Sequence, residues 1–146
     1  MKKLKNNLYR RMKLDELTEE EWYVVSWKYI LSESIIIEFK DRWDWHHISC
    51  CQKLSEIFIR KFKNKLNWTY IWQQQELSEN FIKEFITIFG DEKTNWSIIS
   101  YRQKLSYEFM CEFVNKLNLN SLVFNSKIIL TEEEWNSLRI IKKLIN

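Results

Sequence analysis

Residues 44–62, DWHHISCCQKLSEIFIRKF, and residues 67–85, NWTYIWQQQELSENFIKEF, carry the same pattern twice. A Trp, an Ile, a Gln, a Leu-Ser-Glu triplet, a Phe-Ile pair and a closing Phe recur in the same order, with 23 residues between Trp45 and Trp68. Self-similarity at a fixed period is the sequence signature of a repeat protein, in which each copy folds as one supersecondary unit. The two stretches therefore predict a repeat architecture.

The same spacing extends over about five copies. Trp22 lies 23 residues before Trp45, Trp96 lies 28 residues after Trp68, and one further period reaches Leu119. Nine residues after each of these five positions stands a Leu or an Ile, namely Leu31, Leu54, Leu77, Leu105 and Ile128. In the first four copies a serine follows directly, namely Ser32, Ser55, Ser78 and Ser106. Residues 22–131 are therefore predicted to be the repeat array.

Each copy is predicted to contain two short helices. The first begins at the serine, a preferred N-cap, and its apolar residues recur at the spacing of a helical stripe. The second begins at Asp44, Asn67, Asn95 or Asn118, directly before the Trp, and is expected to turn the Trp, the following Ile and a Leu inward. A helix pair of this length cannot bury its own stripe, whereas stacked neighbours can. We therefore predict an all-α fold, a small α-solenoid of short antiparallel helix pairs.

The two ends of the chain depart from the repeat. Residues 1–13 carry six cations and no acid, and residues 14–21 carry five acids, so residues 1–21 form a basic and then acidic cap. The motif LTEEEW occurs at 17–22 and again at 130–135, with Thr and Glu at capping-box spacing in both. We predict capping helices over 1–13 and 132–146, and a single domain over 1–146. Gly90, the one glycine, is the predicted C-cap of an insertion-bearing helix.

The composition argues against an enzyme and against a membrane protein. Phosphate-binding loops, dinucleotide fingerprints and nucleophile elbows need two or more glycines, and this chain has one. Three cysteines, two of them adjacent, do not make a disulfide framework, and no stretch approaches the roughly 20 apolar residues of a membrane span. We predict a non-enzymatic protein without cofactors, located in the cytoplasm of its host cell.

The segment HHISCC suggests a metal site at first sight. His46 and Cys50, and likewise His47 and Cys51, are four residues apart, a spacing that can hold a metal on a helix. Adjacent residues on a helix point about 100° apart, so the four side chains cannot converge on one ion. The residues equivalent to His46 in the other copies are of surface type, namely Tyr23, Thr69, Ser97 and Asn120. We therefore predict that no metal binds there.

Repeated polar residues are interpreted as structural. Gln52, Gln75 and Gln103 lie between core positions, and we expect them to bond backbone groups of the next copy. The acids Glu33, Glu56 and Glu79 stand in the first turn of a helix, where the helix dipole favours negative charge.

The stretches LSEIFIRKFKNKLNW and WHHISCCQKLSE resemble tandem repeats found in proteins of phages, giant DNA viruses and some AT-rich bacteria. Those repeats read Leu-Ser-Glu-x-Phe-Ile-x-x-Phe followed by Asp/Asn-Trp-x-x-Ile-Ser-x-x-Gln. The resemblance covers roughly residues 22–128, and the fourth copy follows it less closely. It implies a helical repeat fold and a viral or mobile-element origin, and it offers no catalytic residues.

Aromatic residues outside the repeat pattern are the candidates for binding a partner. Trp27, Tyr70, Trp72 and Tyr101 occupy variable positions, and Trp and Tyr are common anchors of protein interfaces. The alternative is that a terminal helix packs over them. Our hypothesis is a protein–protein interaction module, a phage- or virus-encoded inhibitor of a host protein such as an antiviral-defence component.

A second hypothesis is a nucleic-acid binder. Arg60, Lys61, Lys63 and Lys65 form a basic cluster, which also suits the C-terminal end of a helix. Together with Tyr70 and Trp72 this cluster could bind single-stranded RNA or DNA by charge and stacking.

Overall fold

The computed structural model describes residues 2–3, 14–90 and 94–145, and in them nearly all regular structure is helical. The all-α prediction is therefore confirmed. The helices are α2 (Glu19–Lys28), α3 (Glu33–Glu38), α4 (Trp45–Cys51), α5 (Glu56–Phe62), α6 (Trp68–Gln74), α7 (Glu79–Phe89), α8 (Trp96–Arg102), α9 (Tyr107–Glu112), α10 (Leu119–Val123) and α11 (Glu132–Ile145), preceded by a 3-10 turn over Leu14–Glu16. The predicted capping helix at the C-terminus corresponds to α11.

The start of the chain differs from its prediction. Lys2–Lys3 form a short strand, β1, which pairs in parallel with β2 (Tyr29–Ile30), so these two residues are not helical. Tyr29–Ile30 follow α2 in extended conformation and offer backbone groups for such pairing. The remainder of the predicted N-terminal cap, residues 4–13, lies outside the described residues.

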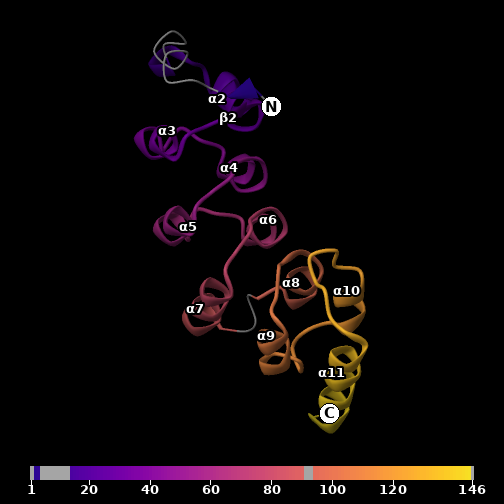
Figure 1. Ribbon diagram of the computed structural model, residues 1–146. Helices are drawn as coiled ribbons and strands as arrows, with labels where there is room; N and C mark the ends of the chain where they lie inside the picture. The colour runs from indigo at the N-terminus through magenta and orange to yellow at the C-terminus, as the bar shows by residue number, and fades with distance from the viewer. Residues whose placement is uncertain (1, 4–13, 91–93, 146) are drawn as a thin grey trace. The chain divides into compact units, whose positions relative to one another are not determined.

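The chain divides into two compact units, residues 1–75 and residues 76–146. In the first unit α2 packs against α4 and α4 against α6, while α3 and α5 form a second row beside them (Figure 1). Within this unit the first row takes the Trp-bearing helix of the first three copies, and the second row takes the Ser-capped helix of the first two. The apolar residues buried in this unit include Trp22, Val25, Ile35, Ile36, Trp43, Ile48, Phe58, Ile59, Phe62 and Ile71.

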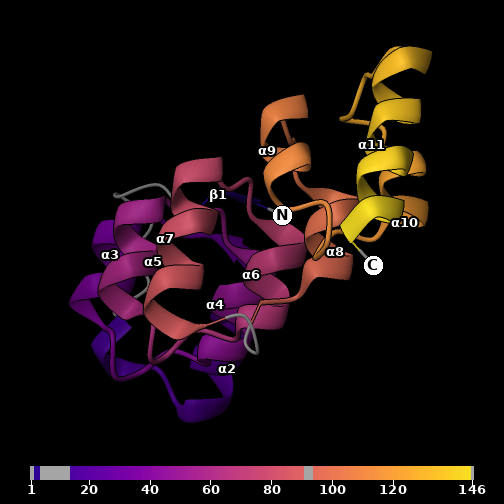
Figure 2. The ribbon, with the colours of Figure 1, turned by 90° about the horizontal axis from the view of Figure 1, so that it is seen from below.

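In the second unit α8 packs against α10, and α9 packs against α11 (Figure 2). Leu138 on α11 is fully buried, so this helix covers apolar surface of the unit. The other buried apolar residues of the unit include Phe81, Ile82, Phe85, Ile99, Phe109, Met110, Leu117 and Leu122.

The predicted helix caps are present. Each N-cap side chain accepts a hydrogen bond from a backbone N–H two or three residues further on, which satisfies a donor that the helix leaves unpaired. The residues concerned are Ser32, Ser55, Ser78 and Ser106 for the first helices and Asp44, Asn67, Asn95 and Asn118 for the second. Thr18 and Glu21 form a reciprocal capping box. Gly90 ends α7 at φ +76°, a backbone conformation that favours glycine.

The tryptophans that mark the repeat are less buried than predicted. Trp22 is buried, but Trp45, Trp68 and Trp96 are only half-buried. The indole N–H groups of Trp45 and Trp68 donate to the carbonyl oxygens of Lys40 and Lys63, both at 3.0 Å. Because these carbonyls belong to the partly exposed loops before the helices, the bonds hold the rings at the edge of the core.

A repeated set of hydrogen bonds, here called the glutamine bridge, joins consecutive copies. Gln52 accepts from the Leu31 backbone N–H at 2.9 Å and donates to the carbonyls of Ser26 and Tyr29 at 2.9 and 2.7 Å. Gln75 accepts from the backbone N–H of Leu54, also at 2.9 Å. Gln103 accepts from that of Leu77 at 3.0 Å. Each bridge reaches the preceding copy, so the predicted direction toward the next copy is wrong.

Two further contacts join the copies. The hydroxyl of Ser49 donates to the Trp45 carbonyl at 2.7 Å and accepts from the Asn67 backbone N–H at 2.9 Å, which links α4 to the start of α6. The carboxylate of Glu33 accepts from both the backbone N–H and the hydroxyl of Ser55, the N-cap of the following copy. The first-turn acid therefore contacts a neighbouring helix as well as facing its own helix dipole.

Candidate interaction surface

The second helices of the first unit turn a row of aromatic and histidine side chains outward. Ile48 and Ser49 on α4 are buried, so His46 and His47, about 200° earlier around the helix, point away from the core. The same geometry turns Tyr23 on α2 and Tyr70 on α6 outward. These are the first and second positions after each Trp, where the copies differ from one another.

Four of these side chains make a continuous series of ring contacts. The Tyr23 and His47 rings lie 4.7 Å apart, the His46 and His47 rings 5.6 Å apart, and the His46 and Tyr70 rings 4.8 Å apart. All three pairs are edge-to-face, with interplanar angles between 80° and 87°, an arrangement that aromatic pairs prefer. We call Tyr23, His47, His46 and Tyr70 the aromatic row. It extends across α2, α4 and α6 without a break.

Trp27 enlarges this surface on α2. It follows Tyr23 by one helical turn, so the two side chains lie on the same side of the helix. Trp27 is 42% exposed and Tyr23 is 51% exposed, so both rings offer accessible apolar area. The surface around the aromatic row therefore exposes aromatic rings of the kind that often anchor a protein interface.

The N-cap of α4 fixes the centre of the aromatic row. One carboxylate oxygen of Asp44 accepts the backbone N–H groups of His46 and His47, and the other lies 3.1 Å from the His47 Nδ1. The same residue thus starts the helix and restricts the rotation of one imidazole ring. A ring held in place loses less conformational entropy when a partner packs against it.

The four predicted anchors differ in how far they are buried in the structure. Trp27 is exposed, and Tyr70 is half-buried within the aromatic row. Tyr101 is 47% exposed on α8 of the second unit, with the Arg102 guanidinium 5.2 Å from its ring. Trp72 is 1% exposed, so its prediction as a surface anchor is wrong.

The burial of Trp72 follows from its place in the copy. It stands where Ser26 and Ser49 stand, on the inward side of the second helix, and both serines are fully buried. Its ring lies 5.7 Å from that of Trp68. A residue that breaks the repeat pattern is thus not necessarily at the surface.

The sequence analysis treated Tyr23 and His46 as surface-type positions but did not include Tyr23, His46 and His47 among the candidates for binding a partner. The signal that could have found them is their position, because residues one and two places after the Trp vary among the copies while those three and four places after it are mostly uniform.

The paired cysteines lie beside the aromatic row, one turn after the histidines. The Cys50 and Cys51 Sγ atoms are 2.9 Å apart, and Cys50 also contacts the His47 carbonyl oxygen at 3.7 Å. Burial, and then the hydrogen bond with Cys51, raises the pKa of the Cys50 thiol from 9.0 to about 12. A thiol with such a pKa stays protonated at neutral pH and is a poor nucleophile. Nowhere in the described ranges do three or more His, Cys, Asp or Glu side chains gather as metal ligands would.

The basic cluster uses much of its charge within the unit. Arg60 pairs with Glu56 at 3.7 Å, and Lys65 pairs with Asp41 at 2.9 Å while its ammonium lies 5.4 Å from the Trp45 ring. The hydrogen bond from Lys65 lowers the pKa of the Asp41 carboxyl. Lys61 lies over the ring of Phe62 at 5.6 Å. These contacts favour the interpretation of the cluster as the solvated end of α5.

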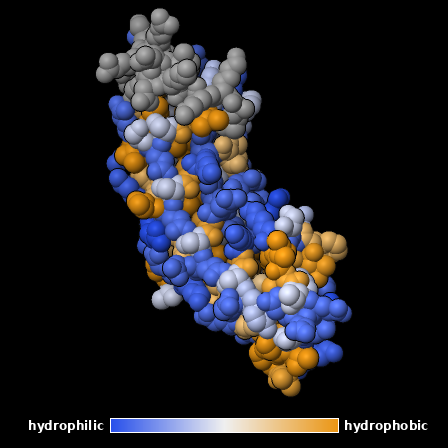
Figure 3. Space-filling model, viewed as in Figure 1, coloured by the Kyte–Doolittle hydropathy of each residue, from blue (hydrophilic) through white to orange (hydrophobic). Residues whose placement is uncertain are grey.

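The second unit exposes apolar residues of its own. Val123 and Phe124 at the end of α10 are 56% and 75% exposed, and Ile129 in the following loop is 93% exposed. Figure 3 shows apolar surface gathered over α10 and at the lower end of α11. None of the helices that the structure describes is both long enough and apolar enough to cross a bilayer.

No protein-family model, no curated protein and no solved structure matches this chain. The functional interpretation therefore rests on the surfaces described above.

Proposed function

We propose that this protein is a non-enzymatic protein–protein interaction module, in which stacked helix pairs continue as a small α-solenoid and the aromatic row with Trp27 binds a protein partner. The single observation that carries the proposal is the unbroken series of outward-facing rings across three helices, with Tyr23 and Trp27 about half exposed. Solenoids use extended surfaces of this kind for protein recognition. Trp and Tyr side chains are frequent hot spots of such interfaces.

The proposal includes a cellular setting, which rests on the resemblance of the repeat alone. In that setting a phage or virus encodes the protein, and it acts in the host cytoplasm by binding a host protein, such as a component of antiviral defence, and blocking its action. Nucleic-acid binding through Arg60, Lys61, Lys63 and Lys65 is the second hypothesis. It is weakened by the ion pairs of Arg60 and Lys65.

The test is recovery of partners from host extract, followed by affinity measurement with the purified partner. Trp27→Ala combined with Tyr23→Ala should weaken binding by at least about 2 kcal/mol, or roughly 30-fold in Kd, because both rings would anchor the interface. Ile57→Ala is the matched control, since Ile57 is 79% exposed on α5 in the other row of helices. Its Kd should stay within about twofold of the wild type.

Salt separates the two hypotheses. Binding to RNA or DNA weakens steeply between 50 and 200 mM salt as phosphate counterions are displaced, whereas a largely aromatic protein interface weakens little. Recovery of nucleic acid alone, with a steep salt dependence, would replace the proposal by the second hypothesis. Unchanged protein binding by the double variant would remove the aromatic row from the interface.

A further inference from the structure

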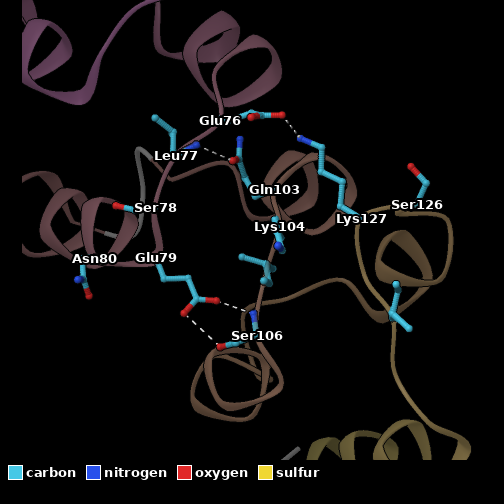
Figure 4. A pocket seen from close by; sticks show the side chains of 12 residues that line it. Glu76, Leu77, Ser78, Glu79, Asn80, Gln103, Lys104, Ser106, Ser126 and Lys127 are labelled. Atoms are coloured by element: carbon cyan, nitrogen blue, oxygen red, sulfur yellow. Dashed lines mark hydrogen bonds and ion pairs between the residues drawn. The ribbon is translucent and has the colours of Figure 1, made fainter.

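A groove of about 960 Å³ crosses the second unit over the segment that joins α8 to α9 (Figure 4). Its volume lies at the upper end of the range of about 300–1,000 Å³ that is usual for ligand sites. The lining comes from three consecutive copies of the repeat, namely residues 76–80, residues 103–106, and Ser126, Lys127 and Ile129. The groove therefore lies where the glutamine bridges connect these copies.

The last glutamine bridge is incomplete at this groove. In the earlier copies the N–H groups of Leu31, Leu54 and Leu77 each donate to a glutamine oxygen at 2.9–3.0 Å. The equivalent residue in the fourth copy is Leu105, and here Asn125 stands in for the glutamine. Its amide nitrogen still donates to backbone carbonyls of the preceding copy, but its oxygen accepts from the Lys127 N–H at 3.0 Å.

The substitution leaves the backbone N–H of Leu105, a residue that lines the groove, without an acceptor. Asparagine is one methylene shorter than glutamine, and Asn125 stands one residue earlier in its copy than Gln103 does. Among the residues that the structure describes, no acceptor bonds the Leu105 N–H, although Leu105 is only 5% exposed. An unpaired buried donor costs free energy, so an oxygen atom supplied from outside would bind there favourably.

The charges of the groove indicate which oxygen it would prefer. Glu76 pairs with Lys127 at 3.3 Å, and Glu79 accepts from the backbone N–H and hydroxyl of Ser106 (Figure 4). Lys104, next to Leu105, has no carboxylate partner within the described ranges. The unused groups are thus an N–H and an ammonium, which together favour a carboxylate.

The first copy shows that an extended chain can lie beside the equivalent stretch, in a copy where Gln52 already bonds the Tyr29 carbonyl and the Leu31 N–H. Tyr29–Ile30 occupy the positions in the first copy that Gln103–Lys104 occupy in the fourth. In the first copy, strand β1 pairs with this stretch in parallel. Addition of a strand to an exposed backbone edge is a common mode of peptide recognition. At the edge of the groove Ile129, 93% exposed, offers apolar contact.

We propose that this groove binds an extended acidic peptide segment. A Glu or Asp side chain of the peptide accepts from the Leu105 N–H and pairs with Lys104, and an apolar neighbour packs on Ile129. This site belongs to the second unit and does not depend on the aromatic row of the first.

The test uses the full ¹⁵N-labelled chain and two probes, the peptides acetyl-Leu-Glu-Leu-amide and acetyl-Leu-Gln-Leu-amide. The Glu peptide should shift the Leu105 amide resonance in a saturable manner, and the Gln peptide should bind about tenfold more weakly because it lacks the charge. Asn125→Gln, which extends the amide oxygen toward the Leu105 N–H, should abolish the shift. Lys104→Gln changes an exposed side chain that cannot disturb the core. It should weaken binding of the Glu peptide by about the same factor as replacing the peptide's Glu by Gln does.

Lys53→Gln is the matched control, because Lys53 is the equivalent residue in a copy whose leucine N–H is already bonded to Gln75. Absence of a shift with the Glu peptide would overturn the proposal. Equal binding of both peptides, full binding by both groove variants, or an equal shift with oligothymidylate would overturn it as well. Trp27→Ala should leave this titration unchanged, so failure here and failure of the proposed function can be told apart.

Discussion

Gln52 illustrates how much a single polar side chain contributes to this fold. It satisfies one buried N–H and two carbonyls of the preceding copy and is 3% exposed. We predict that Gln52→Ala lowers the free energy of unfolding by about 2–4 kcal/mol, because these backbone groups lose their partners inside the protein. Urea denaturation would measure the loss. Gln74→Ala, at an exposed position of α6, should change stability by less than about 0.5 kcal/mol.

Cys50 gives the first unit a specific response to alkaline pH. Its pKa is raised in the folded protein from 9.0 to about 12, so folding favours the protonated thiol. The stabilisation is therefore complete below pH 9, and it is lost as the pH rises from 9 toward 12, where the unfolded chain releases a proton that the folded chain keeps.

We accordingly predict that Cys50→Ser, whose hydroxyl does not titrate in this range, loses less stability between pH 9 and pH 11 than the wild type does. The measurement is the difference between the two unfolding free energies at each pH, which cancels the titration of lysines and tyrosines common to both. A difference that stays constant with pH would show that folding does not raise the pKa of the Cys50 thiol.

At this scale the sequence predicted which residues share a role but not always where they face. The exposed Trp27 and the buried Trp72 both break the repeat pattern, and only their offset from the preceding Trp distinguishes them. The glutamine bridge was recognisable as structural from its recurrence. The direction of the bridge could not be predicted, because the sequence alone does not show whether each glutamine lies next to the backbone of the preceding copy or of the following one.

Among the helices, local signals were the most informative. N-caps act within three residues of themselves, so Ser, Asp and Asn marked the helix starts without knowledge of the tertiary structure. The contact of Glu33 with Ser55 could not be foreseen in the same way, because it joins helices of different copies. The half-burial of Trp45 likewise depends on a loop carbonyl that only the fold brings to its indole N–H.

The Glu33–Ser55 contact makes the start of α5 depend on α3. We predict that Ser55→Ala costs about 1–2 kcal/mol, since it removes both the bond that the hydroxyl accepts from the Phe58 N–H and the bond that it donates to the Glu33 carboxylate. In a Glu33→Ala background the same substitution should cost measurably less, and a double-mutant cycle would report that coupling. Ser97→Ala, at an exposed position inside α8, serves as the control. Strict additivity would mean that the two residues act separately.

For the molecule as a whole, the division at residue 75 predicts uneven stability. Residues 1–75 and 76–146 each bury their own set of apolar side chains, and in repeat proteins a helix pair depends mainly on its nearest neighbours. We predict that Gln52→Ala accelerates amide hydrogen exchange in α3 to α5 more than in α9 and α11. Equal acceleration throughout would show that the chain opens as one cooperative body.

The glutamine bridge also bears on how such a chain can change its length. The second, third and fourth copies each bring their own glutamine, which bonds the extended segment of the preceding copy, and the second and third copies also provide the segment that the following glutamine bonds. An in-frame duplication or deletion of one 23-residue copy among these therefore keeps the hydrogen bonds between the glutamine of one copy and the backbone of the copy before it. Recombination between the tandem copies of the coding sequence could then lengthen or shorten the protein in single steps, without passing through a product whose backbone groups are left unbonded.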